Sequence, residues 1–313
     1  MEMLDIGKRK REFILYHKHG DGDCNGQVLK QIAIQFNLNT KDIFDLSYFY
    51  SITYCVASSL YMLKNRDAIY RNADTFAEEN KKELIFQADR KYVKYVDRFN
   101  RLLKQFTEMP PVSVFIAQTS GNGKTMNGNV ACKYIENWWF FNRFSAYLFL
   151  ETFCDISGIE MVETEKADYG KDRMLYASGL FRVFGLDDYA IETRETRKLP
   201  IRKNEFEKMI LELQEDIKKA NGDDNFLKVE TSLCAYEKFF RGTRYNGYYA
   251  DRQLEETMQL LNNRKFEDVC CAVLEARNKA IEKQFRGEDG GWFGIRQELK
   301  KYYLQNGKIN WNQ

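Results

Sequence analysis

The sequence predicts a mainly α-helical protein, a compact helical domain with at most a minor β element. Only three prolines occur in 313 residues, and helix interiors tolerate proline poorly. Hydrophobic residues make up 44% and aromatic residues 15% of the chain, which is enough for a large core. Several segments repeat apolar residues at steps of three and four, the helical period. We expect one domain over residues 1–313, with two packed lobes of about 1–155 and 156–313 as the alternative.

Charge and cysteine content limit the classes of partner and compartment. The formal net charge is only +2, so a nucleic-acid site would depend on local clusters of charge. Seven cysteines occur without a CxxC pair, which favours a reducing, cytoplasmic compartment, or the host cytoplasm if the chain is viral. Residues 46–63 carry no charge, but their hydroxyl groups favour a buried helix over a membrane span. We therefore expect no membrane partner.

The N-terminal part of the chain predicts three helices, at 27–36, 43–64 and 78–106. The third has the clearest period, and its apolar positions are Ile85, Ala88, Tyr92, Tyr95, Phe99, Leu102 and Phe106. Basic residues recur on its opposite side, at Lys91, Lys94, Arg98 and Arg101. Rows of Lys and Arg bind nucleic-acid phosphates. We expect this helix to contact DNA, and the alternative is an ordinary solvated surface.

An irregular loop at 17–26 contains a possible metal motif. His17, Asp21 and Asp23 have the HxxxDxD spacing of the first metal motif of the DHH-type phosphoesterases. Imidazole and carboxylate groups at this spacing are able to bind manganese or zinc. Because the DHH triplet is absent, we expect a structural turn and no metal site. A metal-dependent phosphoesterase remains an alternative.

A second loop, rich in glycine, lies at 118–129 and follows the best strand candidate, residues 112–117. A strand, a glycine-rich loop and a helix in this order expose backbone amides that bind phosphate. The phosphate-binding candidates are Asn122, Lys124, Thr125 and Asn129. A complete P-loop needs glycine where Gln118 stands. A nucleotide-binding enzyme using Gly121–Thr125 therefore remains an alternative, as does an ordinary turn.

A long apolar helix is predicted over residues 130–153, and it contains two charges, Arg143 and Glu151. They are eight residues apart and so fall on similar faces of the helix. Charges in an otherwise buried helix need partners or a cavity. A structural ion pair and the wall of a site are both open interpretations.

The C-terminal part predicts a partly irregular stretch and then helices at 204–221, 226–240, 251–262 and 265–286, with a last short helix near the end. The helix at 226–240 places Glu230 and Glu237 on one face with two apolar residues. Carboxylates on a partly buried face have raised pKa values and suit general acid–base chemistry. The alternative is a helix end stabilised by ion pairs.

Basic residues alternate with tyrosines directly after these carboxylates. The basic candidates are Lys238, Arg241 and Arg244. Interleaved arginine and tyrosine suit phosphates together with stacked bases. The alternative is an aromatic surface loop.

Three segments resemble a known family. YSITYCVASSLYML at 50–63, FNRFSAYLFLETF at 141–153 and VETSLCAYEK at 229–238 look like the α-glutamyl/putrescinyl thymine pyrophosphorylases, the amino acid:DNA transferases of phage-type DNA hypermodification. The resemblance extends in pattern over about 40–240. It implies a helical fold related to the helix-hairpin-helix DNA glycosylases. The implied reaction replaces pyrophosphate on a 5-pyrophosphoryloxymethyl-uracil in DNA with an amine from an amino acid or a polyamine.

This resemblance implies a role for each group of candidates. Lys124 and Arg143 would neutralise the departing pyrophosphate, and Glu230 or Glu237 would deprotonate the amine. The basic helix and the Arg/Tyr loop would hold double-stranded DNA with the modified base flipped out. The reaction requires no cofactor. The first alternative is a non-catalytic nucleic-acid-binding protein, and the second is the phosphoesterase or nucleotide-binding enzyme described above.

Overall fold

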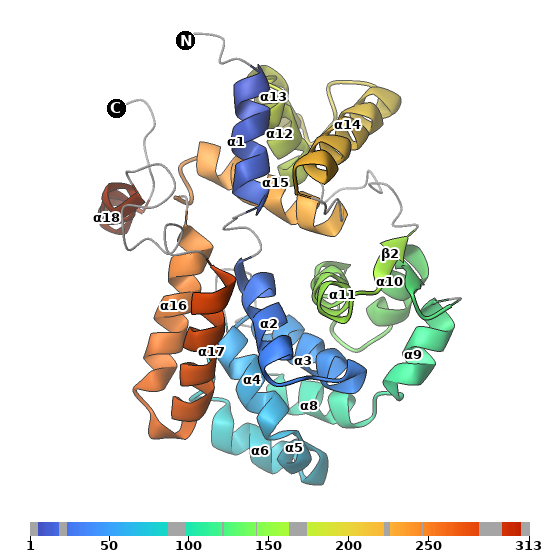
Figure 1. Cartoon of the computed structure of the whole chain (residues 1–313), viewed down its shortest axis with the longest axis vertical. Coiled ribbons are helices and arrows are strands. Elements are labelled where there is room, and N and C mark those ends of the chain that lie inside the picture. Colours follow the sequence, from blue (N-terminus) through green and yellow to red (C-terminus); the bar gives the residue numbers. More distant parts are fainter. Residues whose placement is uncertain are drawn as a thin grey trace. The chain divides into compact units, whose positions relative to one another are not determined.

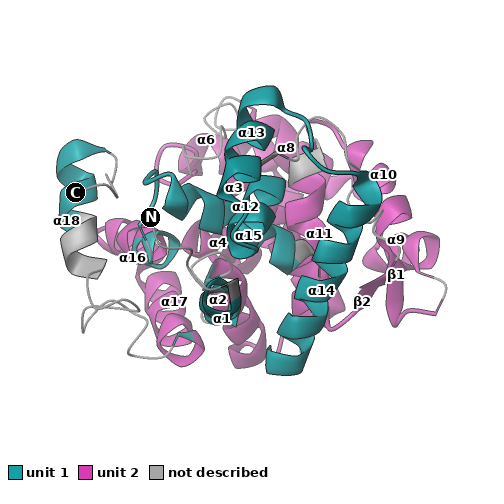
Figure 2. Ribbon diagram, turned by 90° about the horizontal axis from the view of Figure 1, so that it is seen from above, with its two compact units in different colours: residues 1–24, 166–251, 281–313 teal, residues 25–165, 252–280 magenta. Residues whose placement is uncertain are grey.

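The computed structural model describes residues 6–18, 24–86, 98–120, 122–141, 143–162, 174–221, 226–245, 247–281 and 296–307. These residues are mainly α-helical, as predicted (Figure 1). The chain forms two compact units, which Figure 2 colours separately. Unit 1 comprises residues 1–24, 166–251 and 281–313, and unit 2 comprises residues 25–165 and 252–280.

Unit 1 is a group of helices packed around α12 and α15. Its helices are α1 (Ile6–Lys18), α12 (Met174–Val183), α13 (Asp187–Thr196), α14 (Lys203–Asn221), α15 (Phe226–Phe240) and α18 (Arg296–Asn306). Helix α12 packs against both α13 and α15, and α1 contacts α12, α14 and α15. The close approach of α12 to α15 depends on Gly179, because a Cβ atom there would lie 2.2 Å from the carbonyl oxygen of Leu233. The absence of a side chain at Gly179 therefore sets the spacing of these two helices.

Unit 2 contains more helices and a small sheet. Its helices in the N-terminal half are α2 (Cys24–Gln35), α3 (Thr40–Thr53), α4 (Val56–Lys64), α5 (Arg66–Arg71), α6 (Ala73–Asn80), α8 (Phe99–Thr107), α9 (Val112–Thr119), α10 (Gly128–Glu136) and α11 (Arg143–Ser157). Helix α16 (Tyr248–Leu261) begins in unit 1 and continues into unit 2, where η3 (Arg264–Phe266) and α17 (Glu267–Ala280) follow. Helix α3 packs against α4 and α11, and α17 contacts α4.

The minor β element is a pair of short parallel strands, β1 (Thr125–Asn127) and β2 (Glu160–Val162). The predicted strand at 112–117 is wrong, because these residues belong to helix α9. Their β-branched composition favours a strand, but Phe115 and Thr119, one helical turn apart, are the buried positions of α9. Burial of one face of α9 within unit 2 therefore overrides the local preference for a strand.

Two helices that the periodicity predicts as continuous are interrupted. The helix expected at 43–64 divides into α3 and α4 at Tyr54, whose φ of 54° is left-handed. The helix expected at 130–153 divides into α10 and α11 around a turn at 137–141. Apolar periodicity continues across both breaks because the residues on each side face the same core.

The helix expected at 78–106 is also interrupted, because residues 81–86 are described and are not helical. Helix α6 ends at Asn80, a turn follows, and α8 begins at Phe99. Residues 87–97 lie outside the described ranges, and these include Lys91 and Lys94. The predicted helices at 27–36, 204–221, 226–240 and 251–262 are confirmed as α2, α14, α15 and α16.

The two units do not follow the boundary near residue 155 that was expected for two lobes. Helix α1 belongs to unit 1 because it packs against helices from the 174–240 region, and α17 belongs to unit 2 because it packs against α4. Each unit is therefore assembled from segments far apart in the sequence. Within the described ranges, no helix combines the length and the apolar character that crossing a membrane would require.

Candidate nucleic-acid interface

The aromatic turn between α10 and α11 has an inner and an outer half. The ring of Trp138 packs in the core of unit 2, with centroid distances of 5.1 Å to Phe149 and 5.2 Å to Phe141. Phe141 is buried, whereas Trp138 is half-buried. The two residues between them, Trp139 and Phe140, remain half-exposed. The ring contacts of Trp138 and Phe141 therefore anchor the turn to the core of unit 2.

Helix α8 presents two basic side chains beside this turn. Its buried face carries Phe99, Leu102 and Phe106, whereas Arg98 and Arg101 are exposed. The two arginines are three residues apart, which places them on neighbouring positions of the helix surface. Of the predicted basic row, Arg101 lies on α8 and Arg98 is its N-cap residue, while Lys91 and Lys94 lie outside the described residues.

Tyr48 on α3 positions both α8 and the aromatic turn. Its hydroxyl donates a hydrogen bond of 2.9 Å to the carbonyl oxygen of Leu102, and its ring stacks on Phe141 with centroids 5.3 Å apart. The side-chain amide of Gln105 donates to the same hydroxyl at 3.1 Å. A single buried residue therefore contacts the two elements that carry the arginines and the exposed rings.

The arginines of α8 lie over the rings of the turn. The Cζ atom of Arg98 is 3.9 Å from the ring centroid of Phe140, and that of Arg101 is 4.0 Å from the ring centroid of Trp139. Within the described ranges, neither guanidinium forms an ion pair with a carboxylate. By contrast, Lys104 on the same helix pairs with Asp74 at 2.6 Å. We call Arg98, Arg101, Trp139 and Phe140 the Arg/Trp surface.

The sequence analysis found only half of this surface. Arg98 and Arg101 were predicted from the helical row of basic residues. The sequence does not predict the rings as surface residues, because residues 138–141 (WWFF) fall within the apolar helix predicted at 130–153. The signal that could have found them is the run itself, because four consecutive large aromatics cannot all face one side of a helix.

The glycine-rich loop is an internally bonded turn. The side-chain oxygen of Asn122 accepts hydrogen bonds from the backbone amides of Lys124 and Thr125, each at 2.9 Å, and from the Thr125 hydroxyl at 3.1 Å. The amide of Gly123 donates to the hydroxyl oxygen of Ser120 at 2.8 Å. The amides that would hold a phosphate are thus occupied within the loop. A helix rather than a strand precedes it, so the geometry is not that of a P-loop.

The remaining candidates of this region are separate from the loop amides. The side chain of Lys124 is exposed, and Asn129 lies in the first turn of α10, after the N-cap residue Asn127. Arg143 is the first residue of α11, and its side chain lies outside the described part of the structure. Glu151 is buried on the same helix.

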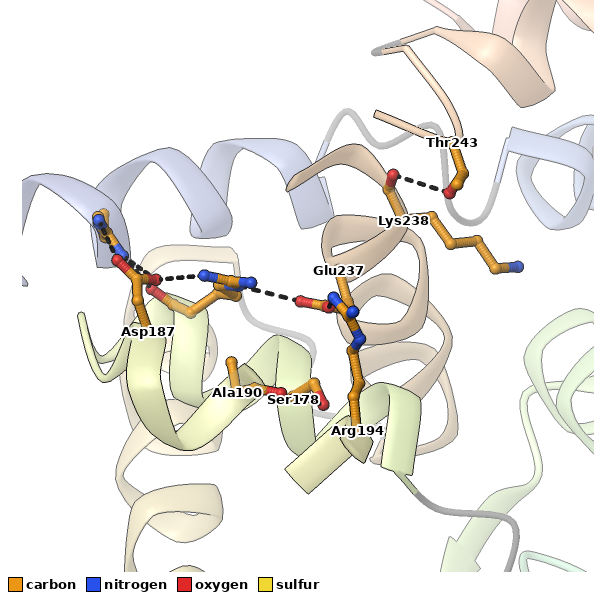
Figure 3. Close-up of polar contacts among 9 residues, drawn as sticks. Ser178, Asp187, Ala190, Arg194, Glu237, Lys238 and Thr243 are labelled. Atoms are coloured by element: carbon orange, nitrogen blue, oxygen red, sulfur yellow. Dashed lines mark hydrogen bonds and ion pairs between the residues drawn. The ribbon is translucent and has the colours of Figure 1, made fainter. Parts of the chain in front are cut away.

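In unit 1, Glu237 belongs to a buried network of charges (Figure 3). Its side chain is 0% exposed. One carboxylate oxygen accepts from Nε of Arg182 at 3.2 Å, and the other accepts from Nη1 of Arg194 at 3.3 Å. Because an arginine binds each oxygen, Glu237 is arranged to neutralise two cations rather than to accept a proton from a substrate. Glu230, two turns earlier on α15, is half-buried.

The network continues from Arg182 to Asp187. Arg182 donates to Asp187 at 2.9 Å, and Arg9 on α1 binds both Asp187 oxygens at 2.8 and 2.9 Å. Burial opposes ionisation of Asp187, but hydrogen bonds from the two arginines outweigh it and lower the pKa of the carboxyl. The arrangement ties α1, α12, α13 and α15 together, with three arginines and two carboxylates.

The Arg/Tyr loop is also internally bonded. Nζ of Lys238 donates to the Tyr249 hydroxyl at 3.1 Å. Arg244 lies over the ring of Tyr248, with its Cζ atom 4.3 Å from the centroid, and donates to the hydroxyl of Tyr303 on α18 at 3.1 Å. Arg241 lies in the turn after α15. Lys238 and Arg244 therefore contact tyrosines of unit 1.

The possible metal motif is only partly described. His17 is buried in α1, and its Nδ1 atom lies 2.8 Å from the Ser232 hydroxyl oxygen. Asp21 and Asp23 lie outside the described ranges. Among the residues that the structure describes, no group of three or more His, Cys, Asp and Glu side chains is placed to hold a metal ion.

No protein family, curated protein or solved structure matches the chain in our comparisons. Within the described residues, the Arg/Trp surface combines two exposed arginines with two half-exposed aromatic rings.

Proposed function

We propose that this protein binds nucleic acid through the Arg/Trp surface of unit 2. The observation that carries the proposal is the stacking of two exposed arginines on two half-exposed rings, without a carboxylate partner in the described residues. Each guanidinium keeps its positive charge and its outward N–H donors, which suit a phosphate group. The neighbouring rings offer apolar contact of the kind that nucleic-acid bases use.

A purely structural role would give a smaller benefit. An exposed cation–π contact contributes about 0.5–1 kcal/mol to stability, and one pair would suffice to fix the turn. The second pair duplicates this contact at the cost of placing two like charges three residues apart on one helix. Binding of an anionic ligand gives both charges a partner, and this favours the proposal.

The resemblance noted in the sequence supports a more specific proposal, an enzyme that exchanges pyrophosphate for an amine on a modified thymine in DNA. Glu230 is then the better candidate for the base, since arginines bind both oxygens of Glu237. Lys124 is exposed and suits the leaving group. In this proposal Glu230→Gln abolishes pyrophosphate release from the modified DNA but leaves DNA binding unchanged.

The binding proposal is tested by fluorescence anisotropy with labelled DNA at about 50 and 200 mM salt, where phosphate contacts cause a steep loss of affinity. We expect Arg98→Glu/Arg101→Glu to weaken binding by about tenfold or more and to reduce its salt dependence. The matched control is Lys218→Glu/Lys219→Glu, an equal change of charge in the exposed last turn of α14. Equal affinities for the two double variants would contradict the proposal.

A further inference from the structure

The two half-exposed rings of the Arg/Trp surface lie side by side on one turn. The centroids of Trp139 and Phe140 are 5.4 Å apart, and the ring planes are inclined by 35°. Trp139 and Phe140 are consecutive residues of this turn. A flat, apolar and partly exposed ring interacts best with another flat surface, such as the face of a nucleic-acid base.

Each ring is paired with a guanidinium at stacking distance. The separations of 3.9 Å for Arg98 on Phe140 and 4.0 Å for Arg101 on Trp139 describe two similar cation–ring pairs. Unpaired bases stack on aromatic rings and on guanidinium planes, while phosphates bind the outer N–H groups of arginine. Two such pairs suit two neighbouring nucleotides of one strand.

The turn is held firmly in the shape that presents these rings. Phe141 is buried, half-buried Trp138 packs against it, and Tyr48 contacts both rings. Phe140 has a φ of 68°, a left-handed conformation that a bulky residue adopts only where its surroundings impose it. The rings are therefore ordered before any ligand arrives, which lowers the entropic cost of stacking.

A DNA duplex cannot use these rings in the same way. Its bases are stacked on one another and show only their edges in the grooves, so a duplex would reach the arginines through phosphates alone. Unpaired nucleotides offer phosphates and base faces together. We propose that the preferred ligand of the Arg/Trp surface is a strand with unpaired bases, with Trp139 as the main stacking residue. This inference rests on the proposed function.

The test compares three labelled probes of equal length with the whole protein: a thymine single strand, a strand that lacks its bases, and a duplex. We expect the single strand to bind at least about tenfold more tightly than the abasic strand, since stacking of even one base accounts for such a factor. Trp139→Ala should lose about tenfold on the single strand and less than about twofold on the duplex. Trp139→Phe, which keeps a ring, should restore most of the affinity.

The outcomes separate the inference from the function on which it rests. Equal binding of the single strand and the abasic strand by the wild-type protein would overturn the inference and leave phosphate binding intact. Equal losses for Trp139→Ala on single strand and duplex would overturn it as well. If none of the probes binds at about 50 mM salt, where phosphate contacts are strongest, the proposed function fails too. The wild-type comparison stands even if Trp139→Ala does not fold.

Discussion

At the scale of single residues, Glu237 shows how a buried charge is accommodated in this protein. Arginines bind both of its oxygens, and the side chain is inaccessible to solvent. Glu237→Gln removes the negative charge and turns an amide group toward an arginine. Loss of one partner from a buried ion pair costs about 3–5 kcal/mol. Since Arg194 is one-third exposed, we expect Glu237→Gln to lower the free energy of unfolding by about 3 kcal/mol, the lower end of this range. Urea unfolding measures this change.

The control for this prediction is Glu215→Gln. Glu215 is in the same unit, is 71% exposed and pairs with Lys219 at 3.8 Å. Exposed pairs of this kind contribute at most about 1 kcal/mol. A Glu237→Gln protein that unfolds at the same urea concentration as the Glu215→Gln protein would show that the network does not stabilise unit 1.

Asp187 gives a prediction about pH. Burial raises its pKa, but hydrogen bonds from Arg9 and Arg182 more than compensate, so the pKa of the folded carboxyl is lower than its usual value. A carboxyl with a lowered folded pKa stabilises the protein above its unfolded pKa, and this stabilisation disappears as the pH falls through the folded value. The difference in unfolding free energy between wild type and Asp187→Asn should thus have its maximum value at pH 7 and decrease below about pH 5. Asp188→Asn, an exposed neighbour, should show no comparable trend.

At the scale of elements, the contact between α12 and α15 depends on Gly179. A Cβ atom there would lie 2.2 Å from a backbone oxygen of α15, so Gly179→Ala must push the helices apart. Forcing an extra methyl into a packed core costs about 1–3 kcal/mol, and we expect a matching decrease in thermal stability. Gly123→Ala is the control, because it meets nothing within 4 Å and bears only the strain of a positive φ. Thermal unfolding of Gly179→Ala at the wild-type temperature would contradict this packing.

The elements also show what the sequence could predict. Helices α14 and α15 were found almost to the residue, because their apolar period is regular and their ends are polar. Helix α9 was mistaken for a strand because Val112, Val114 and Ile116 favour strands locally, while the buried positions Phe115 and Thr119 become evident only in the folded unit. The position of Arg98 and Arg101 on a helix surface follows from spacing. Their pairing with Trp139 and Phe140 depends on contacts between segments that are distant in the sequence. Residue spacing within one helix cannot predict such contacts.

At the scale of the whole molecule, the buried charge network and the candidate binding surface belong to different units. The net charge is only +2, so strong non-specific attraction to nucleic acid is not expected from the protein as a whole. The charge network of Glu237 belongs to unit 1, whereas the four residues of the Arg/Trp surface belong to unit 2. The two features should therefore respond independently to mutation.

Two variants, one in each unit, test this independence. Glu237→Gln should lower the free energy of unfolding by about 3 kcal/mol but leave the affinity for single-stranded DNA within about twofold of wild type. Arg98→Glu/Arg101→Glu should lower the free energy of unfolding by only about 1–2 kcal/mol, the contribution of two exposed cation–π contacts, but should weaken DNA binding by about tenfold or more, because phosphate contacts account for much of the affinity. The measurements are urea unfolding and anisotropy on the same preparations. A Glu237→Gln protein that is folded but has lost DNA binding would place binding residues in unit 1 and contradict the assignment of the interface to α8 and the aromatic turn.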